Sequence, residues 1–168
     1  MNTLLTTLIF LLSFFHISYS QTLVMETGSV VTTHVATAVA LNNTFVDPIV
    51  IAQPPSLNGG DESTVRISNI TPTGFSIFLE ESDENDGAHT TETIHYIVIE
   101  RGLYTFPDGT KLEAGRLSLT NLAWATVTLQ QTYSATPRIF TQVQTNNSST
   151  RYLKTRQRNA SSTNFQVK

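Results

Sequence analysis

Part of the sequence occurs twice, and this internal repeat limits the folds open to the chain more than any other feature. The stretch TFVDPIVIAQPPSLNG at 44–59 returns as TYSATPRIFTQVQTNN at 132–147. The spacing between matching residues grows from 88 at Val39 to 90 at Phe75. Slips of a single residue between aligned segments are what loops tolerate. The sequence therefore predicts a module of roughly ninety residues, present once whole and once in part.

The second copy is incomplete. It stops at Lys168, and counterparts of residues Leu79 through Leu122 are missing from it. Pieces of about 40 residues rarely bury enough surface to fold alone. Either the chain is a fragment of a longer repeat protein, or its tail is disordered or pairs with another subunit. We predict a signal peptide at 1–20, a complete module at 21–122 and a partial second copy at 123–168.

The first twenty residues indicate export. They form an apolar run without acids or bases that closes on the small-residue pattern Ser18-Tyr19-Ser20. This is typical of a secretory signal peptide cleaved before Gln21, although an uncleaved anchor helix is the alternative. No later run approaches the roughly 18 apolar residues that a membrane span needs. We expect a secreted, extracellular chain with no membrane span.

The absence of cysteine fits a fold held together by its core. With no thiol in the chain, disulfides, zinc–thiolate sites and cysteine nucleophiles are excluded. Sequons for N-glycosylation agree with export, and each asparagine is a candidate acceptor. The five are Asn42, Asn69, Asn146, Asn147 and Asn159.

Charge is distributed unevenly between the two copies. All 13 acids lie before residue 130 together with four bases, whereas six bases and no acid follow. Such asymmetry can mark a nucleic-acid-binding tail. In a secreted chain it better fits solvated faces of two unequal copies, or attraction between acidic and basic neighbours. We expect no nucleic-acid partner.

Strand patterns dominate the sequence. Phe75, Ile77 and Leu79 alternate with more polar residues, which indicates a strand with one apolar face. The turn residues at 70–74 favour a hairpin. TIHYIVIE at 93–100 is apolar on both faces, as a central strand covered on both sides would be. The pattern predicts an all-β, antiparallel β-sandwich.

The order of these motifs resembles the H-type lectin domain. The motifs are V-x-L-x-x-T-F-x-x-P-x-V at 39–50, VRISNITPTGFSI at 65–77 and T-x-x-Y-I-V at 93–98. The chain is more similar still to tandem H-type-lectin-like modules of secreted or surface proteins, with the second copy truncated. The resemblance implies a sandwich of about six strands that is commonly a homo-trimer. It also implies binding of galactose-type sugars, often N-acetylgalactosamine, between neighbouring subunits.

The same resemblance points to the polar loop EESDENDGAHTTETIHY at 80–96. In the family, the loop before the last aromatic strand contacts the ligand, and an arginine lies near the place of Arg66. Carboxylates and imidazoles can exchange hydrogen bonds with sugar hydroxyls. Two departures stand out: Glu81 lies near the place of the family's stacking Trp, and no acid follows Gly28 closely. The alternatives are a solvated hairpin loop and a solvent-facing strand arginine. The carbohydrate-binding candidates are Arg66, Asp83, Asp86, His89, Thr91 and Glu92.

Other chemistry on this loop has weaker support. DENDG could offer oxygens to calcium or could form a plain turn, but counted from Asp83 the EF-hand pattern fails because Ile94 takes the twelfth place. His89, Glu92 and His95 do not share one face of a strand, which disfavours zinc. We expect no metal site and no cofactor, with calcium as the open alternative.

Five acids within 80–86 more simply make a hydrated loop than the opposed carboxylates of a glycosidase. We predict that the chain is not an enzyme. Trp124 either stacks on a sugar or packs at a strand start or module junction. The hypothesis is a secreted carbohydrate-binding module that gains avidity from repetition. The alternative is a structural repeat of an extracellular adhesin, in which the polar loop would be buried or dispersed.

Overall fold

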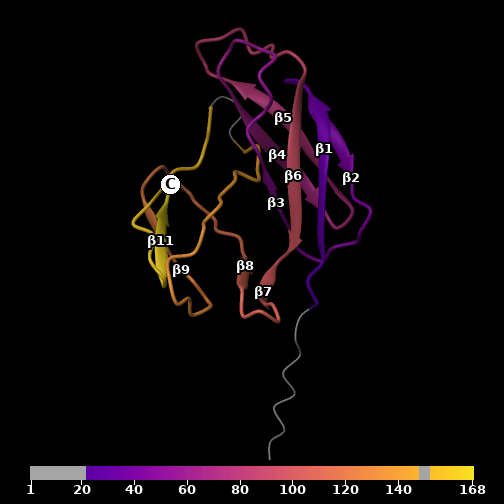
Figure 1. Cartoon of the computed structure of the whole chain (residues 1–168). Helices are drawn as coiled ribbons and strands as arrows, with labels where there is room; N and C mark the ends of the chain where they lie inside the picture. The colour runs from indigo at the N-terminus through magenta and orange to yellow at the C-terminus, as the bar shows by residue number, and fades with distance from the viewer. Residues whose placement is uncertain (1–21, 148–151) are drawn as a thin grey trace, which may run out of the picture.

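The computed structural model describes residues 22–147 and 152–168, so the predicted signal peptide lies outside the described residues. Within these ranges the secondary structure is β-strand without helix, which confirms the all-β prediction (Figure 1). The strands are β1 Met25–Thr32, β2 Thr37–Ala40, β3 Pro48–Ala52, β4 Ser63–Thr71, β5 Gly74–Glu81, β6 Glu92–Glu100, β7 Gly102–Thr105, β8 Lys111–Ala114, β9 Ala125–Thr128, β10 Gln157–Arg158 and β11 Asn164–Val167.

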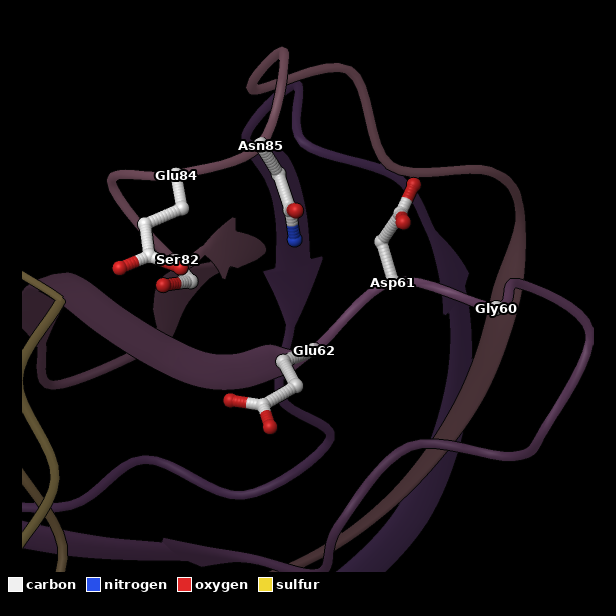
Figure 2. Close-up of a pocket in the computed structure, with 6 residues that line it drawn as sticks. All are labelled: Gly60, Asp61, Glu62, Ser82, Glu84 and Asn85. Atoms are coloured by element: carbon white, nitrogen blue, oxygen red, sulfur yellow. The ribbon is translucent and has the colours of Figure 1, made fainter.

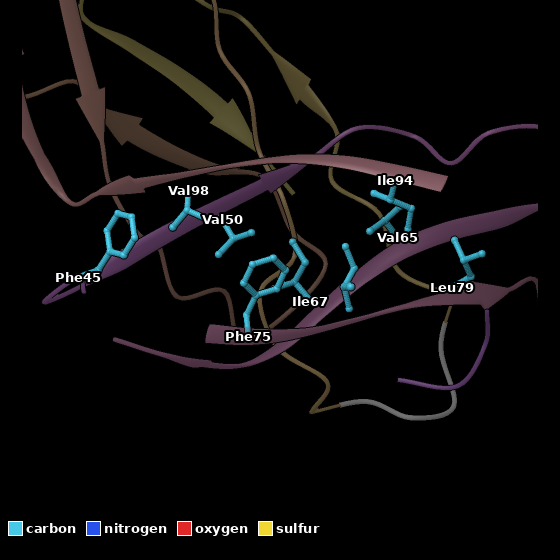
Figure 3. Packing of buried hydrophobic residues seen from close by; sticks show 9 residues of the cluster. Phe45, Val50, Val65, Ile67, Phe75, Leu79, Ile94 and Val98 are labelled. Atoms are coloured by element: carbon cyan, nitrogen blue, oxygen red, sulfur yellow. The ribbon is translucent and has the colours of Figure 1, made fainter. Parts of the chain in front are cut away.

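The first copy consists of two three-stranded antiparallel sheets that share one core. Their strand orders are β1-β6-β3 and β2-β5-β4. Alternation directs one face of each sheet inward, and the side chains of both sheets meet there, as in a β-sandwich (Figure 3). The buried apolar cluster comprises Phe45, Val50, Val65, Ile67, Phe75, Ile77, Leu79, Ile94 and Val98.

The predicted hairpin at 70–74 joins β4 to β5. The ladder shifts register between Ser68 and Thr71, and Asn69 in this bulge has a φ of 50°. Thr71 then pairs with Gly74. Gly74 is needed for close packing, because a Cβ there would lie 2.6 Å from the carbonyl oxygen of Val39. The turn chemistry in the sequence is thus confirmed.

The apolar run at 93–100 forms β6 and takes the predicted central position, between β1 and β3. Its inner face is fully buried at Ile94 and Val98. The other face is covered only in part, since Ile97 is half-buried and His95 is exposed. The expectation of cover on both sides was therefore too strong for the outer face of this strand.

The described part of the second copy repeats one sheet of the first. The order β9-β11-β10 reproduces the order β2-β5-β4. Val127 pairs with Phe165 as Val39 pairs with Phe75. The bulge asparagine also recurs, because Asn159 has a φ of 52°. Backbone geometry thus follows the sequence repeat at these positions, although β10 has two residues where β4 has nine.

The two copies also correspond before residue 123, the predicted start of the second copy. In the first copy, the Glu26 carboxylate accepts hydrogen bonds from the backbone N–H groups of Asn42 and Asn43. In the second, the Glu113 carboxylate on β8 accepts from those of Gln130 and Gln131. β8 therefore corresponds to the start of β1, and it pairs with β7 of the first copy in an antiparallel hairpin.

The second copy lies against the edge strands β3 and β4 of the first (Figure 1). The side chain of Gln142 donates to the carbonyl oxygen of Val65 on β4 at 2.9 Å. That of Gln144 donates to the carbonyl oxygen of Val50 on β3 at 2.8 Å. Side-chain amides of one copy thereby satisfy edge carbonyls of both sheets of the other.

Residues 22–147 and 152–168 contain no helix that is long and apolar enough to cross a membrane.

Candidate functional site

The polar loop singled out in the sequence runs from the end of β5 at Glu81 to the start of β6 at Glu92. Its predicted ligand residues separate into two groups. Asp83, Asp86 and Thr91 are exposed. His89 and Glu92 are buried, with 4% and 1% of their surface exposed. The loop therefore presents only part of the predicted set to solvent.

His89 is held between two carboxylates. Its Nδ1 lies 2.7 Å from Oε1 of Glu81, and its Nε2 lies 3.4 Å from Oε1 of Glu92. The hydroxyl of Ser63 also lies 3.4 Å from Nε2. Gly59 leaves room for the ring, because a Cβ there would lie 2.9 Å from Cε1 of His89. We call Glu81, His89 and Glu92 the buried triad.

Glu92 accepts hydrogen bonds from the neighbouring loop at 53–62. Its carboxylate receives the hydroxyl of Ser56 at 2.5 Å and the backbone N–H groups of Asn58 and Gly59, both at 2.8 Å. Burial by itself raises the pKa of Glu92, but the hydrogen bonds from these three residues and His89 outweigh it and hold the pKa below its ordinary value of 4.5. The carboxylate therefore ties two loops together in its charged form.

The exposed candidates belong to the loop tip. The carboxylate of Asp86 accepts the backbone N–H of Ala88 at 2.9 Å, and Gly87, with a φ of 76°, donates its N–H to Glu81. Beside the tip is a polar hollow of about 300 Å³ (Figure 2). It is lined by Gly60, Asp61, Glu62, Ser82, Glu84 and Asn85. None of the six predicted sugar-binding residues lines it.

Arg66, a carbohydrate-binding candidate, does not face solvent, so the alternative interpretation of it as a solvent-facing strand arginine is wrong. The residue is completely buried. Its guanidinium pairs with the carboxylate of Glu80 and donates to the carbonyl oxygen of Thr145 at 3.0 Å. The side chain is covered because the second copy packs over this edge of the sandwich, so Arg66 connects the copies in this chain.

Trp124 is in contact with two cations. The guanidinium of Arg158 lies 4.0 Å from the ring centroid, and the ammonium group of Lys168 lies 5.1 Å from it. Cation–π contacts of this kind hold an indole within its own module. This agrees with packing at a strand start, the second of the two interpretations of Trp124.

The candidate glycosylation asparagines are all exposed. The side-chain amide of Asn42 donates to Glu26, that of Asn69 to Ser76 and that of Asn159 to Gln166. Asn146 and Asn147 adjoin residues 148–151, which lie outside the described ranges. Over the described ranges, no group of three or more His, Asp or Glu residues is placed to hold a metal ion.

The sequence contained a signal for the buried triad. Glu81 lies on the same inward face of β5 as Ile77 and Leu79, and Glu92 lies on the same inward face of β6 as Ile94. An acid in the apolar phase of a strand must find hydrogen-bond donors inside the fold. Sequence reasoning treated these residues as loop acids and therefore missed Glu81. It had no means of finding Ser56, Asn58 and Gly59 as partners.

Chemically, the buried triad resembles the carboxylate–imidazole pairs that transfer protons in enzymes. Here, however, Glu92 is fully engaged with loop donors, and both ring nitrogens of His89 face protein oxygens. The hollow in Figure 2 does not include any of the three residues. The arrangement is suited to fixing the loops at 53–62 and 82–91.

Fold and site together define a two-sheet β module with a buried carboxylate–imidazole network and a partial second copy. No family model matches the sequence, and no solved structure matches it. A stretch of 118 residues is 36% identical to halomucin from Haloquadratum walsbyi. The match covers 65% of this chain and spans about 1% of the length of that relative.

Proposed function

We propose that this chain is a structural repeat unit of an extracellular surface protein, in which the polar loop stabilises the module. The observation that carries the proposal is the burial of His89 between Glu81 and Glu92. Groups that bind an external ligand keep hydrogen-bonding capacity open to solvent. His89 and Glu92 direct theirs to protein partners instead.

The similarity to halomucin supports this proposal. The matched stretch is about 1% of that protein, which fits a unit within a much longer polypeptide. Its name describes a mucin, and a surface role agrees with the secretory signal expected at 1–20. The contacts of Gln142 and Gln144 with β4 and β3 also fit units that are built to pack in series.

The test combines a glycan array with urea unfolding of the full chain, first with calcium and then with chelator. We expect no glycan binding in either condition. We expect His89→Ala to lower the free energy of unfolding by roughly 2 kcal/mol, because it leaves Oε1 of the buried Glu81 carboxylate without a partner. His95→Ala is the matched control, since His95 is exposed on β6 and should change stability by less than about 0.5 kcal/mol.

Carbohydrate binding is the second candidate function, and one observation favours it. Asp83, Asp86 and Thr91 are exposed on one loop, and that loop borders the polar hollow in Figure 2. Carboxylates and hydroxyls of this kind can bind adjacent sugar hydroxyls. The H-type lectin resemblance adds galactose-type sugars and a trimer as expectations, so sedimentation should accompany the array.

The two functions give different results in the same experiment. Binding of galactose-type glycans that disappears in Asp83→Ala or Asp86→Ala, with stability unchanged, would reject the structural proposal in favour of a lectin. Loss of stability in His89→Ala without any glycan signal would support the structural unit.

A further inference from the structure

In the described residues of the second copy, one sheet of the module is without a middle strand. In the first copy, β6 lies between β1 and β3. The counterparts of β1 and β3 are residues 112–119 and 137–141, placed by the pairs Glu26–Glu113 and Pro48–Pro137. Residues 115–122, which follow β8, and residues 137–141 belong to no ladder in the described structure.

Large apolar side chains are exposed on both flanking segments. Phe140 is 73% exposed, whereas its counterpart Ile51 is half-buried and pairs with Ile97 of β6. Leu119 is 39% exposed, whereas its counterpart Thr32 is 2% exposed.

Leu117 shows the same change. It is 46% exposed, whereas its counterpart Val30 packs against the core of the first copy. These are the positions that lose cover when a β6 strand is absent. We call 115–122 and 137–141 the open face.

We propose that the open face is an acceptor for a strand of the β6 type, supplied by a further stretch of the same repeat. The inference rests on the proposed role as a repeat unit and deepens it by naming the partner. A strand with the pattern of Thr93–Glu100 would pair antiparallel with both flanking segments, as β6 does with β1 and β3. Unpaired edges with exposed apolar residues are otherwise sites of aggregation.

Charge favours the same partner. In the first copy, β6 is preceded by five acids within 80–86. From residue 130 onward the second copy carries six bases and no acid. A β6-type strand that arrives with its acidic loop would therefore bring negative charge to a positively charged acceptor. Opposite charge of this kind steers the partner and favours it over unrelated apolar strands.

The test appends a second copy of residues Leu79–Arg101 after Lys168, because Lys168 is the counterpart of Phe78. Hydrogen exchange is then followed by mass spectrometry at 115–122 and 137–141. In the original chain these amides should exchange rapidly, since they belong to no ladder. In the extended chain we expect exchange slower by about 100-fold or more, as for amides in a packed sheet.

The matched control is the same extension with Ile94→Asp and Val98→Asp in the appended segment only. It keeps the length and the acidic loop but cannot bury its inner face, so we expect no slowing of exchange. A parallel variant, Leu117→Asp in the extended chain, should also abolish the slowing, because Leu117 is the counterpart of Val30, which packs against the core. Val46→Asp, at a residue that is 88% exposed on the first copy, should leave it unchanged.

Three results would overturn the inference. The first is equal exchange with and without the extension, and the second is equal slowing by both extensions. The third is an original chain that already exchanges slowly at the open face and sediments as a dimer, which would mean that a second chain covers it. None of these results alters the glycan array, so failure of this inference is distinguishable from failure of the proposed function.

Discussion

Replacement of Glu92 by glutamine tests whether the polar loop is held from inside. The Glu92 carboxylate accepts hydrogen bonds from Ser56, Asn58 and Gly59 and faces His89. Hydrogen bonds to a charged group contribute roughly 1.5–3 kcal/mol each, against about 1 kcal/mol for neutral pairs. An amide keeps one acceptor oxygen but loses the charge at several bonds together. We expect Glu92→Gln to lower the free energy of unfolding by about 2 to 3 kcal/mol.

The matched control for this substitution is Asp86→Asn. Asp86 lies on the same loop, is exposed, and accepts one backbone N–H that asparagine can also accept. It should change stability by less than about 0.5 kcal/mol. Urea unfolding at neutral pH, followed by circular dichroism, measures both variants. Equal effects of the two substitutions would refute the argument that Glu92 acts as a buried acceptor.

The pH dependence of stability gives an independent check of Glu92. Its pKa is lower in the folded chain than its ordinary value of 4.5, so its stabilising contribution is present above that value. The contribution disappears as the pH falls through the folded pKa. The stability difference between wild type and Glu92→Gln should therefore shrink from neutral pH to about pH 3. A difference that is the same at both pH values would contradict the assignment.

Three further substitutions test the core, a turn and the repeat. Phe75→Ala should lower the free energy of unfolding by about 3 to 5 kcal/mol in a urea titration. Its control, Phe140→Ala at an exposed position, should lower it by less than about 0.5 kcal/mol. A loss below about 1 kcal/mol for Phe75→Ala would refute the place of Phe75 in the core. Gly74→Ala should lower the thermal midpoint, because its Cβ would approach the carbonyl oxygen of Val39 to 2.6 Å; an unchanged midpoint would show that the hairpin adjusts freely. Glu113→Gln should speed hydrogen exchange at 130–131, where Glu113 accepts backbone N–H groups, without affecting β5. Faster exchange in both copies would argue that the Glu113 contact is not independent of the first copy.

Local sequence patterns were sufficient for the strands of the first copy. Alternation at 75–79, the turn residues at 70–74 and the apolar run at 93–100 each depend on neighbours close in sequence. The structure places them in β5, in the β4–β5 hairpin and in the central strand β6. Strand existence could therefore be predicted, because the period of two reflects burial on one face.

The site could be predicted only in part because its contacts come from distant parts of the chain. Alternation placed Arg66 on the outer face of its strand, but its burial depends on Thr145, 79 residues further on. The alternation of β6 could identify Glu92 as an inward-facing acid, but it could not identify the hydrogen-bond donors at 56–59. Asp83 and Asp86 are exposed, as expected for acids in a polar loop. That expectation depends only on neighbouring residues and not on contacts with distant parts of the chain.

The β7–β8 hairpin gives the two copies a mechanical connection. β7 is attached to the first copy through the hydrogen bond from Tyr104 to the carbonyl oxygen of Glu100, and β8 is attached to the second through Glu113. Once the contacts of Arg66, Gln142 and Gln144 between the copies have broken, tension would enter at Gly102 and Ala114, the open end of the hairpin, and break its pairs one at a time. Release of 102–114 would lengthen the chain by roughly 40 Å, since about 3.4 Å per residue is gained less the separation of the paired ends, before either core is loaded. A step of that size in a single-molecule pulling trace would mark the hairpin as an extensible joint that protects the modules from force.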